Sequence, residues 1–314
     1  MLFKSLFTAA LGATAVIAAP LGLEKRQSGG NLTDADILNF ALTLEHLEAT
    51  FYAEYLNKYS AADFASAGFP EWVRYRVSEI ANHERSHVEF LTTALRAAGA
   101  TPVSKCNYTF PVTSVDTFLA VAVILEGVGI SAYLGAAASI ASKAYLTYAG
   151  SILSIETRHN TWLRSSAMNE SPFPSAYEAY NSPDAVFSLA APFIDPKCSQ
   201  IAALPLMAFP ALAASKTAAN AGDKVTFKTN ATGGTTLAIV RPLGNQYFNY
   251  TQGESFTIPK GVQGQTYFIL SSSESIADDA VVAGPAVIEI ADKATLYNYN
   301  NVTVGFDGPQ YNID

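Results

Sequence analysis

The stretch ILSIETRHNTWLR (residues 152–164) places Glu156 and His159 in a segment that otherwise has the apolar spacing of a helix. Residues three positions apart lie on one face of an α-helix, about one turn from each other. The two side chains can therefore direct a carboxylate and an imidazole at one point. On a solvated helix face such a pair would have no consequence, so its meaning depends on what the other helices carry.

The same pair occurs a second time, and two single glutamates complete a pattern. NHERSHVEF (residues 82–90) repeats the Glu-x-x-His spacing. The stretches LEHLEATFY and ILEGVGISAY each carry a single glutamate within helical spacing. In chain order the pattern is Glu, Glu-x-x-His, Glu, Glu-x-x-His, formed by Glu45, Glu84, His87, Glu126, Glu156 and His159.

These stretches fall in four helical segments. Apolar residues recur at three- and four-residue spacing, and residues that break helices are rare inside the segments. The expected helices cover residues 34–59, 71–99, 115–141 and 143–168. The connection between the second and third is longer than antiparallel neighbours require. Four helices with one long middle connection have the topology of ferritin-like bundles.

The six patterned residues form a ligand set for two divalent metal ions. Four carboxylates balance the charge of two such ions, and two imidazoles complete the set. Without metal, four acids in an apolar bundle would repel one another and lose their hydration. The sequence therefore predicts two divalent ions, either Fe or Mn. The alternative is a degenerate bundle that keeps the residues and has lost the metal.

Two tyrosines and a further glutamate accompany the single-glutamate helices. Tyr52 follows Glu45 by seven residues, and Tyr133 follows Glu126 by seven, so each tyrosine lies two turns along the same face. The two halves of the bundle thus repeat one plan. The choice between Glu45 and Glu48 as ligand is open: the tyrosine spacing favours Glu45, and Glu48 is then a supporting acid or a substitute ligand.

Two further histidines lie next to the pattern in sequence. His83 precedes Glu84 and lies about 100° round the helix from it, so we expect His83 to point elsewhere. His46 adjoins Glu45. Neither histidine belongs to the predicted ligand set.

The third helical segment is apolar on nearly all sides and is long enough to span a membrane. Glu126 lies in its middle, where a charge in a membrane would be costly, and no basic flank marks a cytoplasmic side. A buried central helix of a bundle accounts for the same composition. We expect no membrane span.

The N-terminus has the pattern of an export signal. An apolar stretch and two small residues predict a signal peptide over residues 1–19. A short propeptide, residues 20–26, would end at the dibasic pair Lys25-Arg26. We therefore expect a secreted, extracellular protein.

Glycosylation sequons and cysteines agree with export. Six Asn-x-Ser/Thr sequons occur, at Asn31, Asn107, Asn169, Asn230, Asn249 and Asn301. In an oxidising compartment Cys106 and Cys198 are expected to form one disulfide that closes a long loop, and two unpaired thiols are the alternative.

The C-terminal part has a different character. After residue 168 the chain becomes rich in Pro and Ser, with one short helix expected near 183–191, and residues 31–203 are assigned to the bundle with this extension. Residues 211–314 contain short alternating runs separated by Gly, Asn and Pro, which predict a small sandwich-like β domain. The expected fold is α+β with two domains. No titratable cluster occurs in the second domain, so we interpret it as an accessory or interaction domain.

Charge and composition exclude one class of partner. The 314 residues carry a net charge of -8, with 49% hydrophobic and 15% charged residues, and no cluster of Lys and Arg. A nucleic acid would need such a cluster. We expect no nucleic-acid partner.

The four quoted stretches resemble the ferritin-like domain family of fungal secreted stress-response and late sexual development proteins, which is related to plant desiccation-related proteins. The resemblance covers residues 31–168 and extends toward 203. It implies that Glu84 and Glu156 bridge the two metals. It also implies that the terminal ligands are Glu45, His87, Glu126 and His159.

The resemblance implies a fold and a metal site rather than a particular reaction. The β domain and the sequons of this chain disfavour iron storage in a closed cage, and our hypothesis is redox chemistry. A di-metal oxidoreductase of this kind would disproportionate peroxide, as manganese catalases do, or oxidise ferrous iron with oxygen. Its role would be protection against stress or a function in development. The competing hypothesis is a non-catalytic cell-wall or matrix glycoprotein with a degenerate bundle, attached through the β domain.

Overall fold

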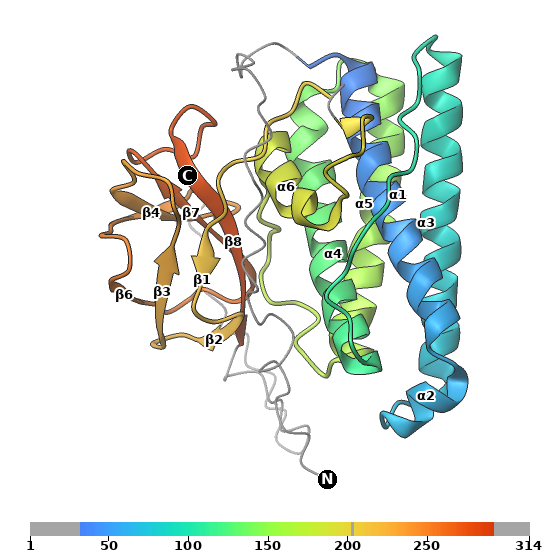
Figure 1. The fold of residues 1–314 in the computed structure, drawn as a ribbon, viewed down its shortest axis with the longest axis horizontal. Coiled ribbons are helices and arrows are strands. Elements are labelled where there is room, and N and C mark those ends of the chain that lie inside the picture. Colours follow the sequence, from blue (N-terminus) through green and yellow to red (C-terminus); the bar gives the residue numbers. More distant parts are fainter. Residues whose placement is uncertain (1–31, 202–203, 292–314) are drawn as a thin grey trace.

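The computed structural model describes residues 32–201 and 204–291, and over this part the α+β fold class is confirmed. Four long helices lie side by side (Figure 1). They are α1 (Asp34–Lys58), α3 (Glu71–Ala97), α4 (Val115–Ala136) and α5 (Lys143–Trp162). The shorter helices are α2 (Ala61–Ser66) and α6 (Pro183–Ala190), and α5 continues into a π-helical turn, Leu163–Ala167.

Several expectations lie outside the described residues. They are the signal peptide 1–19, the propeptide 20–26, the sequons at Asn31 and Asn301, and residues 292–314 of the expected β domain. The described part includes every residue of the predicted ligand set.

Helices α1 and α2 begin where side chains satisfy free backbone amides. The Thr33 hydroxyl accepts from the Asp36 amide at 3.2 Å, and the Asp36 carboxylate accepts from the Thr33 amide at 2.9 Å. This reciprocal capping box starts α1. Ser60 and Asp63 form the same arrangement and start α2. The stretch expected as a loop after the first helix therefore contains a short helix, and its Ser-x-x-Asp spacing is the signal for it.

The apolar third segment is the central helix α4. Val115–Ser139 has a mean hydropathy of 1.9, yet 72% of its most apolar window is buried inside the fold. The Phe118 ring packs against Phe51 and Tyr55 of α1, with ring centroids 5.2 Å and 5.5 Å away. Apolar residues on all sides of α4 are thus covered by other elements of the protein.

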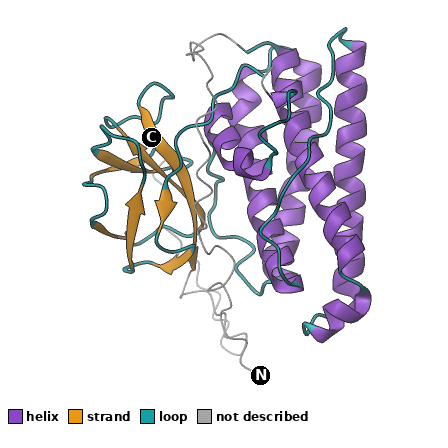
Figure 2. Ribbon diagram, viewed as in Figure 1, coloured by secondary structure: helices purple, strands orange, loops and turns teal. Residues whose placement is uncertain are grey.

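The β domain contains two sheets (Figure 2). The smaller has the order β1-β3-β6, and the larger has the order β2-β8-β7-β4-β5. The strands are β1 (Ala213–Ala214), β2 (Ala218–Asn220), β3 (Lys224–Lys228), β4 (Thr236–Ile239), β5 (Gln246–Asn249), β6 (Ser255–Thr257), β7 (Gly264–Ser271) and β8 (Val281–Ala291). The pairing of β2 with β8 is parallel, and the other described pairs are antiparallel. The sequence does not predict β1 and β2, since two or three residues are too few to show alternation.

The β domain packs directly on α4. The Tyr267 hydroxyl of β7 donates to the Gly127 carbonyl at 2.9 Å. A Cβ at Gly127 would lie 2.4 Å from Oε1 of Gln265, so this glycine makes room for β7. Buried side chains of the β domain join the hydrophobic core of the bundle, namely Ala238, Val240, Tyr267 and Ile269.

A buried ion pair also joins the two parts. The Arg164 guanidinium, 3% exposed, donates to both carboxylate oxygens of Glu289 on β8, at 2.7 Å and 3.0 Å. A bidentate pair of this kind fixes orientation as well as distance. The β domain is therefore held against the bundle by polar contacts and a shared core.

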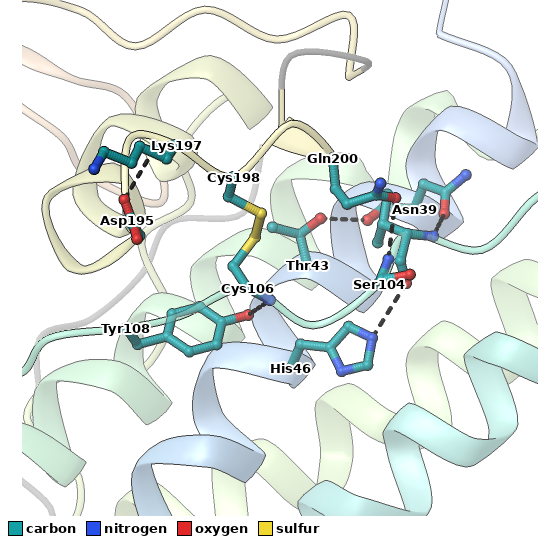
Figure 3. Close-up of a disulfide and its surroundings, with 11 residues drawn as sticks. Asn39, Thr43, His46, Ser104, Cys106, Tyr108, Asp195, Lys197, Cys198 and Gln200 are labelled. Atoms are coloured by element: carbon teal, nitrogen blue, oxygen red, sulfur yellow. Dashed lines mark hydrogen bonds between the residues drawn. A yellow bond between two sulfur atoms is a disulfide. The ribbon is translucent and has the colours of Figure 1, made fainter.

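Cys106 and Cys198 form a disulfide across a sequence separation of 92 residues (Figure 3). It ties the long connection between α3 and α4 to the segment after α6. Beside it, the Asp195 amide donates to the Asn107 carbonyl at 2.9 Å, and Tyr108 pairs with Ile194 in an antiparallel bridge. The long connection is thus fastened along the outside of the bundle.

Candidate metal centre

All six residues of the predicted ligand set meet inside the bundle. Glu45, Glu84, Glu126 and Glu156 are 0% exposed. Ligand atoms come together in two groups of four, and within each group they all lie within 4.8 Å of one another. One group is Glu45, Glu84, His87 and Glu156, and the other is Glu84, Glu126, Glu156 and His159. Glu84 and Glu156 belong to both groups.

Each histidine faces the single glutamate of the helix it packs against. His87 Nδ1 lies 3.2 Å from Glu45 Oε2, and His159 Nδ1 lies 3.1 Å from Glu126 Oε2. The Nδ1 atom of His159 is also 3.0 Å from Glu84. The two halves of the site are therefore related by an approximate two-fold axis.

Each tyrosine binds the single glutamate of the opposite half of the site. The Tyr133 hydroxyl of α4 donates to Glu45 Oε1 of α1 at 2.5 Å. The Tyr52 hydroxyl of α1 donates to Glu126 Oε1 of α4. The seven-residue spacing correctly indicates that the tyrosines lie at the site. In the structure, however, each tyrosine binds the glutamate of the other helix and not that of its own. Each single glutamate therefore keeps Oε1 bound to a tyrosine and turns Oε2 toward a histidine.

The donor atoms at the middle of the site fit a metal ion. Glu84 Oε1 and both carboxylate oxygens of Glu156 are buried without a hydrogen-bond partner among the described residues. Histidine nitrogens lie 3.0 Å from Glu84 Oε1 and 3.3 Å from Glu156 Oε1, within reach of an ion pair when the imidazole is protonated. A buried carboxylate needs a partner of opposite charge, and a divalent cation supplies one.

Burial and like charge shift the protonation of the cluster. Burial, and then the neighbouring Glu84, raises the pKa of Glu156 well above its usual range. Burial also raises the pKa of Glu84, to about 7. Burial alone would lower the pKa of His159, but Glu126 and Glu84 raise it to about 9. In the metal-free protein, protonated groups thus supply the positive charge that bound cations would otherwise provide.

Glu48, left open by the sequence, is buried beside the ligand groups but belongs to neither of them. Glu45 lies in the donor groups, as the tyrosine spacing favours. His46 points away from the centre, and its Nε2 contacts the Val103 carbonyl at 3.2 Å.

The expectation for His83 is wrong. Its Nδ1 lies 2.9 Å from Nε2 of His159, and the two rings stack with centroids 5.2 Å apart. His83 is exposed, so it joins a buried candidate ligand to the protein surface. The angular offset on α3 does not separate the two residues, because the imidazole reaches across to α5.

A cavity of about 880 Å³ extends along α4 between the bundle and the β domain and reaches Glu48 and Gly129. From Ala120 to Gly129, the α4 residues that line it are apolar. Leu44 and Leu47 of α1 continue the apolar lining. The centre therefore has a route of approach on the side of Glu48.

The four-helix bundle with this buried acid and histidine cluster has a ferritin-like fold, and its centre is compatible with a metal site. In agreement, the family model described as the ferritin-like domain matches residues 33–169. These residues form a ferritin-like domain, and the β domain follows it.

Two known proteins are similar to this chain. Protein rds1 of Schizosaccharomyces pombe (strain 972 / ATCC 24843) is 27% identical over 161 residues, which are 51% of this chain and 39% of the relative. The chain thus matches well under two thirds of that protein's length. The crystal structure of a conserved hypothetical protein from Mycobacterium tuberculosis covers 46% of this chain and 96% of its own, at 22% identity and a TM-score of 0.37.

Proposed function

We propose that this protein is a secreted oxidoreductase that handles peroxide at a centre of two divalent metal ions, Fe or Mn, in stress or development. The six residues of the two donor groups would hold the ions, with Glu84 and Glu156 shared between them. One observation carries the proposal: three buried carboxylate oxygens at the middle of the site have no hydrogen-bond partner in the described part of the chain.

The protein's own residues would prepare this centre for the ions. Tyr52 and Tyr133 each fix one carboxylate oxygen, so the other oxygen stays directed inward. Burial in an apolar core excludes bulk water and strengthens each charge interaction. When bound, the metal pair would supply electron exchange by cycling between the +2 and +3 states.

One consideration favours peroxide over ferrous iron as the substrate. Disproportionation needs no co-substrate, because one peroxide is reduced to two waters while another is oxidised to oxygen, whereas ferrous iron would need oxygen as well. Oxidation of ferrous iron remains the alternative reaction in the assay below.

Export is part of the proposal. The apolar N-terminal stretch, the sequons and the single disulfide support it. The sequon asparagines in the described residues are all exposed, as glycosylation requires: Asn107, Asn169, Asn230 and Asn249.

The test measures metal content and activity of protein purified from the culture medium. We expect about two ions of Fe or Mn per chain, and oxygen release from hydrogen peroxide. The Glu84→Ala, Glu156→Ala double variant should lose both. Glu54→Gln, at an exposed position on α1, is the matched control. Wild-type protein that is folded but binds no metal would show that the bundle is degenerate. Oxidation of ferrous iron without turnover of peroxide would show that ferrous iron, not peroxide, is the substrate.

A further inference from the structure

The two single-glutamate helices differ at one equivalent position. Tyr52 follows Glu45 by seven residues just as Tyr133 follows Glu126, so position 48 on α1 corresponds to position 129 on α4. Both lie one turn beyond the ligand glutamate. Position 48 is a glutamate, and position 129 is a glycine. The approximate two-fold relation of the site is broken there.

The missing side chain on α4 makes room for the extra acid on α1. A Cβ at Gly129 would lie 3.3 Å from Glu48 Oε1 and 3.0 Å from Glu156 Oε2. The oxygens of Glu48 and Glu156 thus flank the point where a side chain at 129 would begin. A Cβ there would be a tight contact for both carboxylates, which would have to move by a few tenths of an ångström, so the glycine leaves room for this pairing of acids.

The surroundings of Glu48 do not account for a buried charge. Its residue exposure is 4%, and no hydrogen bond or ion pair joins it to another described residue. Its Oε1 and Oε2 of Glu156 lie beside the same point at Gly129. Glu48 is therefore buried next to the acid cluster, and no described Lys, Arg or His forms an ion pair with it. A bound cation would give this carboxyl group the partner that it lacks.

We propose that Glu48 is a fifth carboxylate ligand of the metal centre, placed on the side that faces the cavity along α4. The inference rests on the proposed function, since it assumes that the centre binds metal. Glu48 stands outside the two donor groups, and its Oε1 lies beside Gly129 next to Oε2 of Glu156, which belongs to both groups. A bound cation would attract the Glu48 carboxylate. The centre is then asymmetric, with the additional oxygen donor on its open side.

The Glu48→Gln variant tests this directly, because it keeps the side-chain shape and removes the charge. Metal-free protein would be titrated with Mn²⁺ and with Co²⁺ against a competing chelator, and the Co²⁺ visible absorption would be recorded. We expect the variant to bind one of the two ions at least about tenfold more weakly than wild type and to alter the Co²⁺ spectrum. Glu54→Gln, exposed on the same helix, should match wild type.

Folding does not confound this comparison. Removing one of five neighbouring acids relieves repulsion, so metal-free Glu48→Gln should unfold at a temperature equal to or above that of wild type. Unchanged affinities and an unchanged Co²⁺ spectrum, in a wild type that binds two ions, would overturn the ligand role of Glu48 and leave the di-metal function standing. A wild type that binds no ion would overturn both.

Discussion

The two helical hairpins of the bundle, α1 with α3 and α4 with α5, carry nearly the same site and differ at two places. Glutamate, tyrosine and the Glu-x-x-His pair occupy equivalent positions in both hairpins. Glu48 has Gly129 as its counterpart, and His83 has Ile155. The shared residues build a symmetric frame of donor atoms, whereas of the differing residues Glu48 lines the cavity and His83 is exposed to solvent.

The largest expected effect concerns the charge of the shared frame. Glu84 has its pKa raised from an ordinary value near 4.5 to about 7, so the stability that its proton provides is complete below pH 4.5 and is lost as pH rises through 7. His159 has a pKa raised to about 9, and its contribution is present below pH 6.5 and lost as pH rises through 9. Each shift corresponds to about 3 kcal/mol. Metal-free protein should therefore become less stable between pH 5 and pH 9.

Chemical unfolding at pH 5, 7 and 9, in chelator and in Mn²⁺, measures this effect. The free energy of unfolding in chelator should fall with pH, and the stabilisation by Mn²⁺ should grow with pH, because metal binds the deprotonated ligands. Glu84→Gln should flatten part of the slope in chelator. A metal-free stability that stays level or rises over this range would contradict the charge assignment.

The next effect tests whether the tyrosines that both hairpins share contribute equally to metal binding. Tyr52→Phe and Tyr133→Phe each remove the hydroxyl that orients one single glutamate. Loss of an outer partner of a ligand typically costs 10–100-fold in metal affinity. We expect two equal losses within that range, measured by chelator competition. Tyr145→Phe on α5, outside the donor groups, is the control. Losses that differ tenfold between the two site variants would show that the frame is not symmetric.

Features that depend on residues close together in the sequence could be predicted, and features that depend on contacts between distant residues could not. Helical spacing and capping residues are local, so the four long helices and the six residues that meet in the candidate site could be placed from sequence alone. Contacts between helices are not local: the seven-residue spacing of Tyr52 is visible, but its bond to Glu126 needs the packing of α1 on α4. The same holds for Gly127, because the side chain that a larger residue would meet there belongs to Gln265 of β7, far along the chain.

The smallest expected effect concerns His83, whose counterpart in the other hairpin is Ile155. If His159 binds metal through Nδ1, its Nε2–H donates to Nδ1 of His83, which lies 2.9 Å away. Partial burial, and then the nearby His159 and His87, lower the pKa of His83, so it stays neutral and can accept this bond at pH 7. His83→Ala should weaken metal binding about tenfold, at the low end for such partners because the site is exposed.

The equivalent residue of the other hairpin provides the comparison. Ile155→Ala changes the α5 position that corresponds to His83, where no imidazole meets a ligand, and should leave metal affinity and the Co²⁺ spectrum unchanged. His83→Gln retains an acceptor and should recover part of the affinity lost in His83→Ala. Equal metal affinities in His83→Ala, Ile155→Ala and wild type would mean that the outer hydrogen bond does not orient His159. The asymmetry of the centre would then rest on Glu48 alone.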